Sequence, residues 1–233
     1  MKWKLHSVVQ PFSGAANNAV NMGELSKWRM QNPVKGYNDF YQKNWDYNNR
    51  YKVYEAILQQ ENLSAQAIDY FEFGVASGVS FKWWLKENAL TDSRFYGFDT
   101  FEGLPEKWGP FAKGSMSHSL ESLNIFDERA SFYKGLFQQT LIPFLEAYNS
   151  SNRKIIHIDS DLFSAAIFTL TQLYRFLKPG DILVFDEFAV PQHEFLAFKI
   201  FTESFYINYE VIAAANNYLF VAVMIKPPTP EGE

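Results

Sequence analysis

The sequence predicts an α/β fold, a doubly wound Rossmann-like sheet that is mostly parallel and ends in an antiparallel C-terminal edge hairpin. Three observations favour it. Short apolar runs alternate with helical patterns for five rounds. A glycine turn, Gly74 to Gly78, follows the first of these runs. The last two β-rich runs are separated by Asn216-Asn217, which is typical of a hairpin.

Length and composition limit the class of protein. We expect the 233 residues to comprise an N-terminal helical or irregular arm or lid at 1–62, one domain at 63–226 and a disordered tail at 227–233. The net charge of -5 argues against a nucleic-acid partner, and the lack of cysteine excludes disulfides and thiolate metal sites. No apolar run approaches the ~20 residues that span a bilayer. We therefore expect a cytoplasmic protein with no membrane partner.

The N-terminal segment is the least regular part of the pattern. Residues 1 to about 40 lack periodicity, because Gly14 and Asn32-Pro33 interrupt it. The segment contains aromatic residues, so we expect it to form a lid, a homo-oligomer arm or packed N-terminal helices. Helical spacing is clear only from Asn44 to Asn62.

The remaining elements follow in order. Parallel strands are expected at 68–73, 94–98, 130–135, 153–158 and 182–185, and the edge hairpin at 209–215 and 218–225. One helix is expected to begin near Phe81. Three more are expected at 138–148, 164–177 and 193–204. Residues 107–120 show little periodicity, and a long loop inside a compact domain is usually functional. We expect a mobile flap over a site, with a plain surface insertion as the alternative.

The glycine turn indicates a small-molecule cofactor site. Glu72 lies near the end of the first strand, Gly74 and Gly78 form the turn, and Ser80 follows. Glycines present no Cβ, so a ligand can approach the backbone. The helix that starts here directs its unpaired N–H groups toward that ligand.

Asp99 ends the second strand, beside the turn in a strand–helix–strand unit. An acid at this place can accept hydrogen bonds from both hydroxyls of a ribose. The alternative is an aspartate that caps a helix or closes a turn.

Four more acids follow apolar strands directly. They are Asp159, Asp161, Asp186 and Glu187. Ligands of open α/β sheets bind outside the carboxyl ends of the strands, so these side chains should share one cleft. Asp161 could instead cap the helix that follows. Asp159, Asp186 and Glu187 would suit Mg²⁺ or Ca²⁺.

These residues carry a resemblance to a known family. The first block, from Glu72 to Ser80, resembles the first motif of class I S-adenosylmethionine-dependent methyltransferases. Four further blocks resemble the macrocin/mycinamicin-type sugar O-methyltransferases in order and spacing: YGFDTFEGLP at 96–105, KGLFQQTL at 134–141, HIDSDLF at 157–163, and KPGD at 178–181 leading to Asp186-Glu187. The likeness covers about Ile68 to Phe188.

The resemblance implies a role for each matched position. Glu72, Gly74, Gly78 and Ser80 would hold the methionine part of the cofactor, Asp99 its ribose, and Gly135, Leu136 and Phe137 its adenine. Asp159, Asp186 and Glu187 would bind the metal, and Asp161 would be the general base. Two positions depart from the family: Glu187 stands where an aspartate is usual, and Leu162 where some relatives use a histidine as base.

The sequence thus predicts an S-adenosylmethionine-dependent O-methyltransferase, assisted by Mg²⁺ or another divalent cation. Its partner would be a small-molecule acceptor with a hydroxyl group, a sugar or another natural product. One alternative is a nicotinamide-dependent oxidoreductase, although Gly74 and Gly78 do not fit the G-x-G-x-x-G spacing. Another is a non-catalytic binding protein that keeps the cofactor fold.

Overall fold

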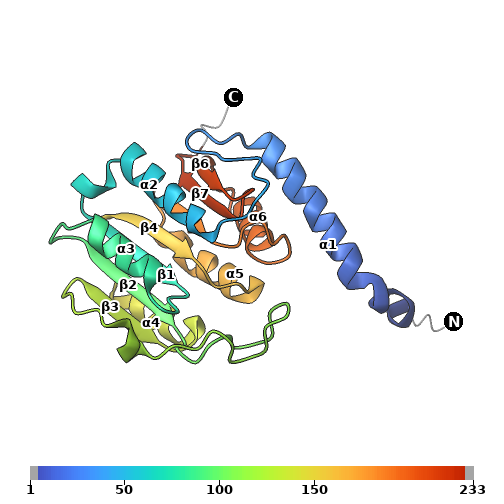
Figure 1. Cartoon of the computed structure of the whole chain (residues 1–233), viewed down its shortest axis with the longest axis horizontal. Coiled ribbons are helices and arrows are strands. Elements are labelled where there is room, and N and C mark those ends of the chain that lie inside the picture. Colours follow the sequence, from blue (N-terminus) through green and yellow to red (C-terminus); the bar gives the residue numbers. More distant parts are fainter. Residues whose placement is uncertain (1–4, 229–233) are drawn as a thin grey trace.

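A seven-stranded sheet forms the centre of the computed structural model, which describes residues 5–228 (Figure 1). The strand order is β3-β2-β1-β4-β5-β7-β6. The strands β1 to β5 pair in parallel, while β7 runs antiparallel to both β5 and β6. This confirms the predicted fold and its edge hairpin. The strands are β1 (Ile68–Phe73), β2 (Arg94–Asp99), β3 (Ala130–Lys134), β4 (Arg153–Ile158), β5 (Ile182–Phe185), β6 (Tyr209–Ala215) and β7 (Phe220–Ile225).

Helices cover both faces of the sheet, which explains the continuous apolar strands. One core joins α2 (Arg50–Gln60) and α3 (Val79–Glu87) to one face. A second core joins α4 (Phe137–Ala147), α5 (Phe163–Leu173) and α6 (Glu194–Ser204) to the other. The strand β1 is buried along its whole length. Its register places Glu72 beside His157 of β4, so two polar side chains meet inside this layer.

The N-terminal segment, for which both helical and irregular structure were expected, is largely helical. Residues 5–31 form one long helix, α1 (Leu5–Gln31). A single glycine costs a helix only about 1 kcal/mol, so Gly14 does not end it. Near its C-terminal end, Trp28 is buried against the α4–α6 core and donates from Nε1 to the Tyr209 hydroxyl at 2.7 Å. The other end projects from the body, and Phe12 and Val20 are exposed there (Figure 1).

The start of α2 also differs from its predicted start at Asn44. The α-helix begins at Arg50, after a 3₁₀ turn over Tyr47–Asn49. Asp46 caps this turn, because its Oδ1 accepts from the Asn48 N–H at 2.9 Å. The capped turn fixes the direction in which Tyr47 and Arg50 leave the backbone.

Smaller differences occur at three ends. The hairpin turn extends to Leu219, because Asn216, Asn217 and Tyr218 all have positive φ, and β7 starts at Phe220. The α-helix α5 stops at Leu173 and continues as a 3₁₀ turn over Tyr174–Phe176. The predicted tail at 227–233 lies almost entirely outside the described residues. Within residues 5–228, no helix is both long and apolar enough to span a membrane.

Candidate active site

A cavity lies at the carboxyl ends of β1, β2 and β4, the edge of an open α/β sheet at which ligands bind. Five of the residues predicted from the sequence line it: Gly74, Asp99, Leu136, Phe137 and Asp159. The loop after β2 contributes further wall at 103–105 and Met116. The structure therefore brings the predicted ribose, adenine and strand-end positions together.

Gly74 allows the ends of β1 and β4 to approach. Its φ is +102°, and a Cβ here would overlap the backbone oxygen of Asp159. Its N–H donates to the Phe98 carbonyl at 2.9 Å, and the Asp159 N–H donates to Phe73 at 2.9 Å. Gly78 also has positive φ, +71°, but its free side faces Leu123 rather than the cavity.

Asp99 ties the first two strand ends together. Its Oδ2 accepts from the Ala76 N–H at 2.8 Å, and its Oδ1 accepts from the Phe101 N–H at 2.6 Å. Asp99 therefore closes a turn, as the alternative interpretation of this residue predicted. The same carboxylate lines the cavity, and each oxygen keeps a lone pair for a further donor.

A second cavity adjoins the first and shares Ala76, Met116 and Asp159 with it. Its acidic floor consists of Asp159, Asp161, Asp186 and Glu187. Its walls come from two segments whose role the sequence left open, the start of α2 with Tyr47, Asn48, Arg50 and Tyr51, and the loop with Trp108 and Phe111.

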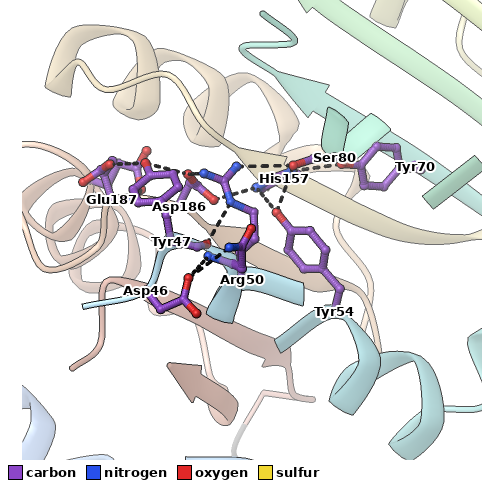
Figure 2. A network of polar contacts seen from close by, with 11 residues as sticks. Asp46, Tyr47, Arg50, Tyr54, Tyr70, Ser80, His157, Asp186 and Glu187 are labelled. Carbon is purple, nitrogen blue, oxygen red and sulfur yellow. Dashed lines mark hydrogen bonds and ion pairs between the residues drawn. The ribbon is translucent and has the colours of Figure 1, made fainter. Parts of the chain in front are cut away.

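The two carboxylate oxygens of Asp186 lie in different surroundings. Its Oδ2 lies 3.4 Å from Arg50 Nη2 and 3.2 Å from the Tyr47 hydroxyl oxygen. Its Oδ1 is buried and has no hydrogen-bond partner among the described residues. Tyr47 also donates to Glu187 Oε1 at 2.5 Å (Figure 2). Tyr47 and Arg50 could not be assigned to the site from the sequence, because only the tertiary fold carries the start of α2 to the ends of β4 and β5.

Burial and mutual repulsion change the acidity of this floor. Burial, and then the charge of Asp186, raises the pKa of Asp159 well above its usual value. Burial, followed by Glu187 and Asp186, raises the pKa of Asp161 to about 7. The pKa of Glu187 is also raised by burial, although its bond from Tyr47 opposes this. Such a floor favours a bound cation or a proton.

Figure 2 shows a polar network that includes the buried residues Tyr54, Tyr70, Ser80 and His157. Tyr70 donates to Glu72 Oε2 at 2.6 Å and lies 2.9 Å from His157 Nδ1. Tyr54 lies 3.3 Å from His157 Nε2 and 3.2 Å from Ser80 Oγ. Burial raises the pKa of Glu72 to about 8. Glu72 and Ser80, both predicted at the cofactor, therefore belong to this network and not to either cavity wall.

The sequence analysis passed over His157, Tyr54 and Tyr70, because they stand inside apolar strand and helix patterns that predict core. It also passed over Glu194, at the start of α6, which is fully buried. Glu194 Oε2 accepts from the Glu187 N–H at 2.9 Å. Glu194 thereby fixes the backbone that carries Glu187.

The residues present fit a divalent cation. Asp159, Asp186 and His157 each offer a ligand atom, and these atoms all lie within 4.8 Å of one another. The buried, unpartnered Oδ1 of Asp186 supplies the oxygen that such an ion would need.

Comparison with known protein families identifies the family to which this chain belongs. Residues 71–188 match the family model of a methyltransferase domain. The chain belongs to this methyltransferase family. The matched segment runs from β1 to just beyond β5 and contains every site residue predicted from the sequence.

Solved structures of methyltransferases share the fold. The O-methyltransferase NovP is 17% identical, with a TM-score of 0.60, and the match covers 91% of this chain and 99% of that chain. The calicheamicin methyltransferase CalS11 is 18% identical, with a TM-score of 0.61, and 76% and 78% are covered. The structure described as cmcI-D160 Mg-SAM is 13% identical, with a TM-score of 0.51, and 87% and 96% are covered. No curated protein matches the sequence of this methyltransferase.

Proposed function

We propose that this methyltransferase transfers a methyl group from S-adenosylmethionine to a hydroxyl of a small-molecule acceptor. The observation that carries the proposal is the pair of cavities that meet at Ala76 and Asp159. Methyl transfer is an in-line displacement, so donor and acceptor must lie in adjoining sites. We also propose that the protein is a member of the macrocin/mycinamicin-type sugar O-methyltransferases.

The first cavity would hold the cofactor. Asp99 offers carboxylate oxygens to the ribose, and Leu136 and Phe137 offer an apolar wall to the adenine. Gly74 keeps the backbone open where the methionine part would lie. Glu72 at the end of β1, Ser80 at the start of α3, and the turn residues Gly78 and Gly135 would support this cavity from outside its lining.

The second cavity would activate the acceptor. Asp161 stands on its floor with a pKa of about 7, which suits a base that works near neutral pH. We assign it the proton of the acceptor hydroxyl. A bound divalent cation, Mg²⁺ or another, would lower the pKa of that hydroxyl. Asp159 and Asp186 would hold the cation, and Glu187 is the further ligand expected from the sequence.

The walls of the second cavity indicate the acceptor. Trp108 and Phe111 stack with ring centroids 5.5 Å apart, and Tyr47 and Tyr51 also line the cavity. Among the described residues, Arg50 is the one basic side chain in the wall, and it is already paired with Asp186. Aromatic walls over an acidic floor favour a neutral sugar or natural product over an anion.

The proposal extends to location and assembly. We place the enzyme in the cytoplasm and expect a homo-oligomer that uses α1, because Phe12 and Val20 leave apolar surface on this projecting helix.

A transfer assay tests the function. The protein is incubated with methyl-labelled S-adenosylmethionine and a panel of glycosides and hydroxylated natural products. We expect label in at least one product, loss of transfer with EDTA and recovery with a divalent cation. Cofactor binding without transfer to any acceptor would contradict the proposal and favour a binding protein. Transfer that is unchanged by EDTA would remove the cation.

A further inference from the structure

We infer that His157 is the third protein ligand of the cation, in place of Glu187, so that the site has mixed nitrogen and oxygen donors. Imidazole nitrogen suits first-row transition metals, whereas Mg²⁺ takes oxygen ligands. The site should therefore prefer Mn²⁺ to Mg²⁺. The catalytic use of this ion rests on the proposed function, but the site itself is argued from its own contacts.

The two sides of Asp186 separate the candidate ligands. Oδ2 is occupied by Arg50 and Tyr47, and Tyr47 also binds Glu187. Oδ1 has no hydrogen-bond partner among the described residues, although Asp186 is only 1% exposed. An ion that satisfies Oδ1 would thus bind on the side away from the contacts that hold Glu187.

His157 lies on that side. Its Nε2 is 3.8 Å from Asp186 Oδ1. This separation is too long for a hydrogen bond. Two ligands of one ion, each at about 2.1 Å from it, can lie up to about 4.2 Å apart. The gap between these atoms therefore has the size that a shared ion requires.

Asp159 completes the set from the same strand end. His157 and Asp159 are two residues apart, so they extend to the same face of the chain. Their ligand atoms and the Asp186 carboxylate all lie within 4.8 Å of one another. Asp159 and Asp186 also line the second cavity, which gives the ion access from solvent.

The hydrogen bonds of His157 place the lone pair of the neutral ring on Nε2, the nitrogen nearest Asp186. Tyr70 donates its proton to Glu72, so its oxygen accepts from the Nδ1–H of His157 at 2.9 Å. The neutral ring then carries its lone pair on Nε2. Metal-binding histidines commonly donate their other N–H in this way. Tyr54, 3.3 Å from Nε2, can turn its proton toward Ser80 Oγ at 3.2 Å.

Pulsed electron paramagnetic resonance of the Mn²⁺-loaded protein tests the ligand directly. We expect nitrogen coupling from a bound imidazole, which isotopic labelling of histidine alone should change. His157→Asn should abolish the coupling. His193→Asn is the matched control and should keep it, because His193 is outside the cluster. Bound Mn²⁺ without nitrogen coupling, or coupling that survives in His157→Asn, would overturn the inference.

Affinity gives a second readout on the same protein. We expect Mn²⁺ to bind at least ~10-fold more tightly than Mg²⁺, and His157→Asn to remove most of that preference. Glu187→Gln should keep the nitrogen coupling. Equal affinities for Mn²⁺ and Mg²⁺ in the wild type would contradict the inference. If His157→Asn does not fold, the nitrogen coupling of the histidine-labelled wild type still tests the ligand.

Titration with S-adenosylmethionine separates this inference from the proposed function. Cofactor binding without nitrogen coupling would overturn the histidine ligand and leave the function. Nitrogen coupling without cofactor binding would overturn the function and leave the metal site.

Discussion

Gly74 determines how closely the ends of β1 and β4 approach, and with them the two cavities. Gly74→Ala should cost more than about 2 kcal/mol of unfolding free energy, because the new Cβ meets backbone at positive φ. Urea unfolding measures this. Gly14→Ala is the control, since nothing lies within 4 Å of a Cβ there, and it should stabilise by up to about 1 kcal/mol. Equal stability of Gly74→Ala and wild type would contradict the strained turn.

Asp161 is the residue to which we assign the proton transfer. Asp161→Asn should lower kcat at least ~100-fold, since general bases typically contribute that much, while the affinity for S-adenosylmethionine stays within ~3-fold. In the wild type, kcat/KM should fall as the pH drops below about 7, because the base is then protonated. Steady-state kinetics across pH measure both effects. Near-normal turnover of Asp161→Asn would exclude Asp161 as the base.

Single residues differ in how far the sequence reveals them. Asp99, Asp159, Asp161, Asp186 and Glu187 could be placed, because acids after apolar strands meet at one edge of a parallel sheet. Ser80 could not, since its position in a glycine turn suggests a ligand contact while its hydroxyl is buried against Tyr54. The double role of Asp99 emerged only from its two backbone hydrogen bonds.

At the scale of elements, two segments outside the sheet complete the second cavity. The start of α2 brings Tyr47 and Arg50 over the acidic floor, and the loop after β2 brings Trp108 and Phe111 opposite. The loop at 107–120 lies beside the site. Its movement as a flap stays a prediction. The loop shows little periodicity, and the helical spacing from Asn44 to Asn62 does not reveal which part of the sheet the start of α2 meets.

The loop should control the acceptor and not the cofactor. Trp108→Ala should raise the KM for the acceptor about 10-fold, because it removes one face of an aromatic wall, and leave cofactor affinity unchanged. Phe126→Ala is the matched control, since Phe126 is 94% exposed and outside both cavities. Kinetics with each substrate varied in turn decide this. A loss confined to cofactor binding would refute the assignment.

The helix α1 shows why local pattern failed at the N-terminus. Val9, Phe12 and Val20 are all exposed on this helix, so its sequence lacks the apolar stripe by which amphipathic helices are recognised. The central strands β1, β4 and β5 were predictable for the opposite reason. They are buried on both faces, and such strands read as continuous apolar runs.

Across the whole molecule, the buried acids oppose folding at high pH. The pKa values of Asp161 and Glu72 are raised to about 7 and about 8 in the folded protein, above their unfolded values near 4. Their contribution to stability is therefore complete below about pH 4 and lost as the pH rises through about 7 to 8. We expect the metal-free protein to be less stable toward urea at about pH 8 than at about pH 5.

Two comparisons test the part of this pH effect that comes from Asp161 in the acidic floor. Asp161→Asn should lose less stability over the same pH range, because it lacks one titrating group. A divalent cation added at the higher pH should restore stability, because it binds the folded protein. Stability that rises steadily from the lower to the higher pH in the metal-free wild type would refute the effect.

The most direct measurement is a calorimetric titration of the protein with S-adenosylmethionine and, separately, with NAD. We expect S-adenosylmethionine to bind and NAD not to bind. Leu136→Trp should weaken that binding at least ~10-fold by filling the first cavity, whereas Ile142→Trp, on the exposed side of α4, should not. Binding of NAD in place of S-adenosylmethionine, or no binding of either, would contradict the account.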